Sequence, residues 1–154
     1  MNQEEYLSEI LWAVTGEVYG QALFQTAAEQ AEDKEVSRKC AVLADLEAAT
    51  LARLQTLIDK YSLTYNDDEH IERGRQNGRK IIERGWQETM VLFNEAVGDD
   101  VDRMERLLDN APEEDSGALQ FLVAHEKALA FFIEQELAGS VESLSEAHKL
   151  LQET

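Results

Sequence analysis

The spacing of apolar residues between Val36 and Tyr61 constrains the fold of this chain more than any other feature. Positions on one face recur at alternating intervals of four and three, which is the repeat of an α-helix: Val36, Cys40, Leu43, Glu47, Thr50, Leu54, Leu57 and Tyr61. This face is apolar except at its centre, where Glu47 and Thr50 are expected to point inward. A buried carboxylate is costly unless it is paired, protonated or bound to a metal ion. Glu47 therefore marks the place to look for function.

Composition predicts one all-α domain. The chain has 154 residues and a single proline, and no segment alternates for long at period two, so we expect one helical-bundle domain over residues 1–154. With 32 acidic against 14 basic residues and a net charge of -18, the surface is unsuited to nucleic acid or anionic lipid. The first residues do not resemble a signal peptide, and no apolar run reaches the roughly 20 residues that span a membrane, so a cytoplasmic protein is expected.

Four long helices account for most of the chain. We expect them over residues 4–31, 35–61, 86–110 and 113–138, joined by short turns that make neighbours antiparallel. The third should continue through Gly98, because the same apolar face resumes beyond it. A polar connecting helix over 69–85 and a short helix after Gly139 complete the fold. The basic residues of the connecting helix predict a solvated face rather than an anion site, since its glycines follow no strand.

Two other long helices also carry an acid on the apolar face. Glu17 interrupts the face of the first helix and Glu126 that of the last. Glu17 and Glu47 lie on opposite sides of the turn at Asp33, and at about 1.5 Å per residue both are roughly 21–24 Å from it. Glu126 is similarly far from the turn at Pro112. Some of the 32 acids will fall on such a face by chance, but three at one level favour convergence, and Asp100 is a candidate for a fourth.

Three segments around these acids resemble a known family. They are Glu17-Val-Tyr-Gly-Gln-Ala-Leu-Phe, Leu43-Ala-Asp-Leu-Glu-Ala-Ala-Thr and Ala124-His-Glu-Lys-Ala-Leu-Ala-Phe-Phe. An acid at the middle of each helix of an antiparallel four-helix bundle is similar to the ferritin-like superfamily, and more specifically to its rubrerythrin-like branch. That resemblance implies an antiparallel ferritin-like bundle in which two helices each give a Glu and two each give a Glu-x-x-His pair to two iron or manganese ions.

Two departures from that pattern argue against a di-iron centre. Thr50 follows Glu47 and Leu129 follows Glu126 at the positions where the family has histidine. His125 directly precedes Glu126 and should point about 100° away from it, so we expect a packed or surface histidine, at most hydrogen-bonded to a carboxylate, rather than a replacement ligand. Without imidazole, the acids would suit one hard divalent cation, and the candidate ligands are Glu17, Glu47, Glu126 and Asp100.

Three hypotheses for function follow. The first is a ferritin-like protein whose inward carboxylate cluster binds iron, manganese or another divalent cation weakly or not at all, and which is not a redox enzyme. The second is a helical interaction or scaffold protein that acts as a homodimer. The third is a rubrerythrin-like di-iron oxidoreductase. The sequence shows no nucleophile with its base, no phosphate-binding loop and no zinc-type cysteine and histidine set.

Overall fold

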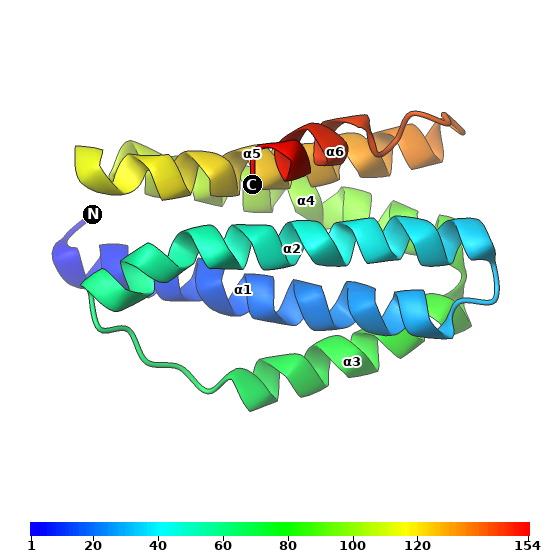
Figure 1. Cartoon of the computed structure of the whole chain (residues 1–154), viewed down its shortest axis with the longest axis horizontal. Coiled ribbons are helices and arrows are strands. Elements are labelled where there is room, and N and C mark those ends of the chain that lie inside the picture. The colour runs from blue at the N-terminus through cyan, green and yellow to red at the C-terminus, as the bar shows by residue number, and fades with distance from the viewer.

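A computed structural model describes the whole chain, Met1–Thr154, and it contains helices and no strands (Figure 1). The long helices are α1 (Gln3–Gln30), α2 (Lys34–Lys60), α4 (Trp86–Asp109) and α5 (Ser116–Leu137). Between them and after them lie α3 (Asp67–Arg84), the 3-10 helix η1 (Glu113–Asp115) and α6 (Ser145–Gln152). The all-α prediction is confirmed, and α4 runs unbroken through Gly98 as expected. No helix has both the length and the apolar character needed to cross a membrane.

Short polar side chains define where several helices begin. Asn2 accepts a hydrogen bond from the Glu5 amide, Asp33 accepts from the amides of Glu35 and Val36, and Asn66 caps α3. Only Gly85 separates α3 from α4. Its φ of 102° lies in a region that side chains rarely adopt, so glycine permits this one-residue connection.

The helices form two antiparallel pairs that pack face to face (Figure 1). In one pair α1 lies beside α2, and in the other α4 lies beside α5, while α2 contacts α5 across the bundle. The chain leaves α2 at one end, and α3 carries it back along α1 to the other end, where α4 begins (Figure 1). Because α3 makes this crossing, α2 and α4 run in the same direction. The short α6 packs on α2 and α5.

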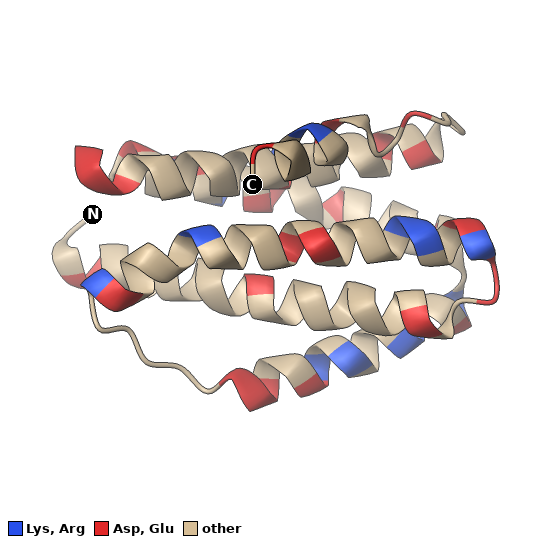
Figure 2. Ribbon diagram, viewed as in Figure 1, with Lys and Arg blue, Asp and Glu red and all other residues tan.

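The connecting helix is more closely packed than the sequence suggested. Its basic residues, which Figure 2 shows along the helix, are exposed as predicted, but Gly74 and Gly78 are buried against α1. A Cβ atom at Gly74 would lie 2.5 Å from the backbone oxygen of Tyr19, and one at Gly78 would lie 2.6 Å from that of Leu23. The two glycines therefore let the backbones of α3 and α1 approach each other.

The predicted acids separate the apolar core into two parts. One part contains Ile10 and Val14 of α1 together with residues of the other long helices towards the same end, and the second contains Leu23, Phe24 and their neighbours towards the opposite end. Glu17 lies between these groups along α1. The same is true of Glu47 along α2, Asp100 along α4 and Glu126 along α5. The middle of the bundle is thus a polar layer between two apolar ones.

A buried carboxylate and histidine cluster

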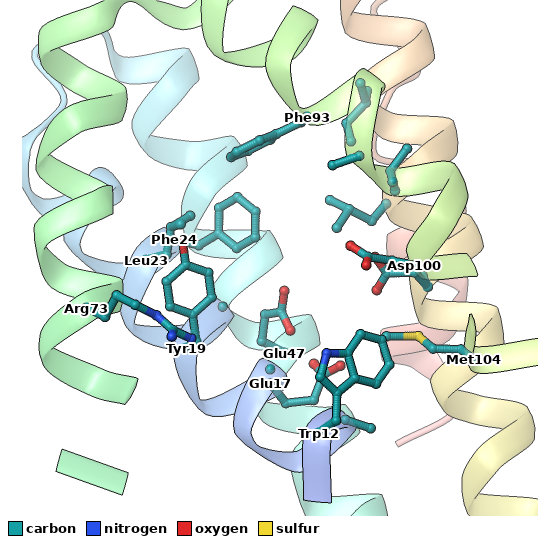
Figure 3. Close-up of a pocket in the computed structure, with 18 residues that line it drawn as sticks. Trp12, Glu17, Tyr19, Leu23, Phe24, Glu47, Arg73, Phe93, Asp100 and Met104 are labelled. Carbon is teal, nitrogen blue, oxygen red and sulfur yellow. The ribbon is translucent and has the colours of Figure 1, made fainter. Parts of the chain in front are cut away.

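The structure brings together the three inward acids from three different helices. Glu17, Glu47 and Glu126 are 2%, 5% and 7% exposed, which places each in the interior. Glu17 and Glu47 point towards each other between α1 and α2 (Figure 3). Carboxylate oxygens of Glu17 and Glu126 also lie within 4.8 Å of each other and of a ring nitrogen of His125.

His125 is part of this cluster: it is a packed histidine beside the carboxylates, although the sequence did not place it among the candidate ligands. The ring is 1% exposed, its Nδ1 lies 3.3 Å from Glu17 Oε2, and its Nε2 lies 3.6 Å from Glu47 Oε2. It reaches the acids because α5 buries a wider arc than the single stripe that contains Glu126. A second stripe with helical spacing is also buried, and it contains Phe121, His125, Ala128 and Phe132. That spacing was the signal in the sequence that identifies the histidine.

Neither residue at the family's histidine positions replaces an imidazole. The Thr50 hydroxyl donates a hydrogen bond to the Leu46 carbonyl at 3.0 Å, within its own helix. Leu129 lines a neighbouring cavity with an apolar side chain. The cluster therefore contains one imidazole, and it comes from the residue before Glu126 rather than three residues after it.

The absence of a side chain at Gly20 leaves the space that the Glu47 carboxylate occupies. A Cβ atom at Gly20 would lie 2.6 Å from Glu47 Oε1 and 2.7 Å from its Cδ. Since Gly20 is three residues after Glu17, it lies on the same side of α1 as that acid. A side chain here would push the carboxylate of Glu47 away from Glu17 and His125.

Two atoms of the cluster lack a hydrogen-bond partner. They are Glu17 Oε2 and His125 Nδ1, which are fully buried and 3.3 Å apart but not aligned for a hydrogen bond. An unsatisfied buried polar atom costs roughly 1–3 kcal/mol, so most such atoms in proteins have a partner. Because the two atoms lie 3.3 Å apart and close to an oxygen of Glu126, the space that they border is a candidate position for a bound cation.

The charges of the cluster are strongly coupled. Burial raises the pKa of Glu17 well above its usual range, and the carboxylates of Glu47 and Glu126 raise it further. Burial also acts to raise the pKa of Glu47, but the positive charge of His125 and the polar contacts with Glu17 and His125 outweigh it, so that pKa is lowered. Burial acts to lower the pKa of His125, but the Glu47 carboxylate outweighs it and raises that pKa. Without a metal ion, these shifts favour a proton on Glu17 and an ion pair between His125 and Glu47.

Glu126 and Asp100 occupy the side of the cluster that faces α4. Burial raises the pKa of Glu126 to about 7; the charge of His125 opposes this shift, and Glu47 and Asp100 add to it. Asp100 is half-buried and makes no hydrogen bond or ion pair of its own, and burial raises its pKa as well. It is not among the residues whose ligand atoms all lie within 4.8 Å of one another, but its charge reaches Glu126.

A cavity of about 300 Å³ adjoins the cluster between α1 and α4, two helices that contact each other at few positions. All four acids line it, and most of its other walls are apolar (Figure 3).

Comparisons of the chain with protein-family models, with curated proteins and with solved structures gave no match.

Proposed function

We propose that this protein is a ferritin-like bundle that binds one divalent transition-metal ion through Glu17, His125 and Glu126. The observation that carries the proposal is the pair of unpartnered, buried atoms Glu17 Oε2 and His125 Nδ1. Two ligands that each lie about 2.0–2.1 Å from a tetrahedral ion are about 3.3 Å apart. The two atoms are separated by 3.3 Å, and an oxygen of Glu126 lies close enough to be a third ligand.

The donor set favours particular metals. One imidazole with two carboxylates suits Mn²⁺, Fe²⁺, Co²⁺ or Zn²⁺ better than Mg²⁺ or Ca²⁺, which prefer oxygen ligands alone. Glu47 faces the second ring nitrogen of His125 at 3.6 Å. A carboxylate on that nitrogen is the usual partner of a metal-bound histidine, because it fixes the tautomer and orients the ring. Glu47 thus has a supporting role in this proposal, and Glu17, His125 and Glu126 are the ligands.

The residues do not fit two metal ions. The dinuclear pattern of the superfamily needs two Glu-x-x-His pairs, and here the corresponding positions hold Thr50 and Leu129. His125 on α5 provides a single imidazole, whereas the two-metal pattern needs one histidine for each ion, from two different helices. We therefore propose that the two-metal redox centre of the superfamily is absent.

The path of the chain supports the ferritin-like part of the proposal. Ferritin-like bundles have one long crossover connection between the second and third bundle helices. In this protein the segment after α2 makes such a crossing, with α3 lying along α1 on the way (Figure 1). An up-and-down bundle would instead join α2 to α4 by a short turn.

Metal titration of the full chain tests this function. The protein is stripped with a chelator and titrated with Mn²⁺, Co²⁺ and Zn²⁺, and we expect one ion per chain. Glu17→Gln and His125→Gln should each weaken binding by at least tenfold, because each removes a ligand. Glu95→Gln, which removes one exposed acid from α4, is the matched control and should bind normally. Two ions per chain would instead support a di-iron type of centre, and no bound ion would refute the metal site.

A second candidate function is the homodimeric scaffold. The observation in its favour is that α4 exposes two adjacent apolar side chains, with Val91 48% and Leu92 41% exposed. Sedimentation of the wild type and of Val91→Glu/Leu92→Glu distinguishes the cases. A dimer that the double variant separates into monomers would support the scaffold, and a monomeric wild type would refute it.

A further inference from the structure

The cavity between α1 and α4 is large enough for a small organic molecule. Its volume is about 300 Å³, whereas an engineered apolar cavity of about 150 Å³ binds benzene. The rim includes exposed residues, among them Gly16 on α1 and Ala96 on α4, so the cavity opens to solvent between these helices. A molecule with one ring and a short chain is of suitable size.

The walls and the floor of the cavity differ in chemistry. The apolar part is formed by side chains of α1, α4 and α5, which include Leu23, Phe24, Phe93, Val97, Leu129 and Ile133. The acidic part, here called the floor, contains the carboxylates of Glu17, Glu47 and Asp100 (Figure 3), and Glu126 also lines the cavity. A ligand that fills this space needs an apolar body and one polar end that reaches the acids.

The floor stays acidic even when a divalent ion is bound. Such an ion offsets two of the four carboxylate charges, and His125 is the one basic side chain in contact with these acids. Arg73 is the one basic residue that lines the cavity, and it lies across the space from Asp100 with its guanidinium 4.8 Å from the centre of the Tyr19 ring (Figure 3). Arg103, three residues after Asp100, is paired with Glu9 at 2.7 Å. Asp100 therefore forms no ion pair within the chain, and the charge of the nearby Arg103 only partly opposes the burial that raises its pKa.

We infer that this cavity binds a small apolar amine, such as a primary aralkyl amine, with its ammonium group between Asp100 and Glu126 and its hydrocarbon body against Phe24 and Phe93. An ammonium group donates three hydrogen bonds and supplies the missing positive charge, so it suits two carboxylate acceptors. A carboxylic acid of the same shape is repelled by the carboxylates of the floor. An alcohol carries no charge and therefore leaves the negative charge of the floor unbalanced. The inference goes beyond the proposed metal site, because Asp100 is not one of the metal ligands.

Calorimetric titration with three probes of the same shape tests this inference. They are 2-phenylethylamine, 2-phenylethanol and 3-phenylpropionate, each added to the full chain with and without Mn²⁺. We expect the amine to bind at least tenfold more tightly than the alcohol and the acid not to bind. Equal affinity for amine and alcohol, or preferential binding of the acid, would overturn the inference.

Two variants locate the bound amine. Asp100→Asn keeps the size of the side chain and should reduce the preference for the amine by at least tenfold. Gly16→Leu should block the cavity, since a Cβ atom there meets nothing within 4 Å and the side chain can extend into the opening. Gly98→Leu is its matched control, because that glycine also has open space but does not line the cavity. Amine binding that survives both Asp100→Asn and Gly16→Leu would refute the site.

The outcomes separate this inference from the proposed function. Metal binding without amine binding would refute the amine site alone. Amine binding that requires Asp100, in a protein that binds no metal, would refute the metal site alone. Because Asp100→Asn leaves all three proposed metal ligands in place, we expect it to retain one metal ion per chain.

Discussion

Among individual residues, Glu126 links the chemistry of the cluster to the stability of the bundle. Its carboxyl group is buried in the folded protein with a pKa of about 7, whereas a free glutamate has a pKa of about 4.3. The folded state therefore binds this proton more tightly than the unfolded state does. For such a group, the contribution to stability is fully present below about pH 4 and is lost as the pH rises through about 7.

Glu126→Gln should remove this pH dependence, because glutamine stays uncharged. In metal-free protein we expect the variant and the wild type to have similar free energies of unfolding near pH 4 to 5. Near pH 8 the variant should be more stable by about 2–4 kcal/mol, from the difference between the two pKa values. Urea denaturation across this pH range measures the difference, in which the titration of all other groups largely cancels. Parallel pH profiles would show that Glu126 ionises in the folded state as easily as in water.

The sequence identified the acids of the site better than its histidine. Glu17, Glu47 and Glu126 could be found because each interrupts an otherwise apolar face, and helix rise places them at one level. His125 was not predicted as a ligand because it points about 100° away from Glu126, but a helix packed on two sides buries two stripes. Neighbouring residues such as His125 and Glu126 can then both reach a site that lies between those stripes.

Among the helices, α3 shows most clearly what periodicity leaves out. Its existence followed from its caps and its charge pattern, and its exposed basic face was expected. Its docking on α1 was not, because the contact is made by Gly74 and Gly78 through close backbone approach rather than by an apolar stripe. An absent side chain gives no hydrophobic signal, so such a contact is invisible to a pattern of apolar residues.

Gly74→Ala and Gly78→Ala should loosen α3 from α1. The added methyl group would meet backbone oxygen atoms of Tyr19 and Leu23, which cannot move as a side chain can. Overpacking of this kind costs about 1–3 kcal/mol, and we expect that loss in urea denaturation together with faster hydrogen exchange in α3. Gly98→Ala is the control: its methyl group meets nothing, so helix propensity should stabilise α4 by about 0.5–1 kcal/mol. Equal effects at the three positions would refute the close approach.

At the level of the whole molecule, the sequence predicted the order of the helices and their antiparallel pairs. It did not predict that α1 and α4 make few contacts with each other. Short turns made α1 antiparallel to α2 and α4 antiparallel to α5, as expected. The cavity depends on the distance between α1 and α4, which belong to different pairs. That distance results from the packing of the whole bundle, including α3, and no local pattern encodes it. The cavity therefore appears only in the structure.

The net charge of -18 makes general and specific effects of cations separable. Repulsion among exposed acids destabilises a compact state. Salt weakens this repulsion, because the Debye length falls to about 10 Å at 0.1 M. We expect the melting temperature to rise with NaCl in the wild type and equally in Glu17→Gln. This response depends on the surface and not on the buried cluster.

A bound ion should stabilise the protein beyond this screening. Ligand binding to the folded state adds about 2.7 kcal/mol when the free ligand is at about 100 times its Kd. Mn²⁺ at about 0.1 mM should therefore raise the melting temperature of the wild type more than NaCl or Mg²⁺ at equal ionic strength. Glu17→Gln should lose this increment while keeping its response to NaCl, because Glu17 Oε2 is buried and cannot take part in surface screening. If Mg²⁺ and Mn²⁺ stabilise both proteins equally, the effect belongs to the acidic surface and the cluster holds protons instead of a metal ion.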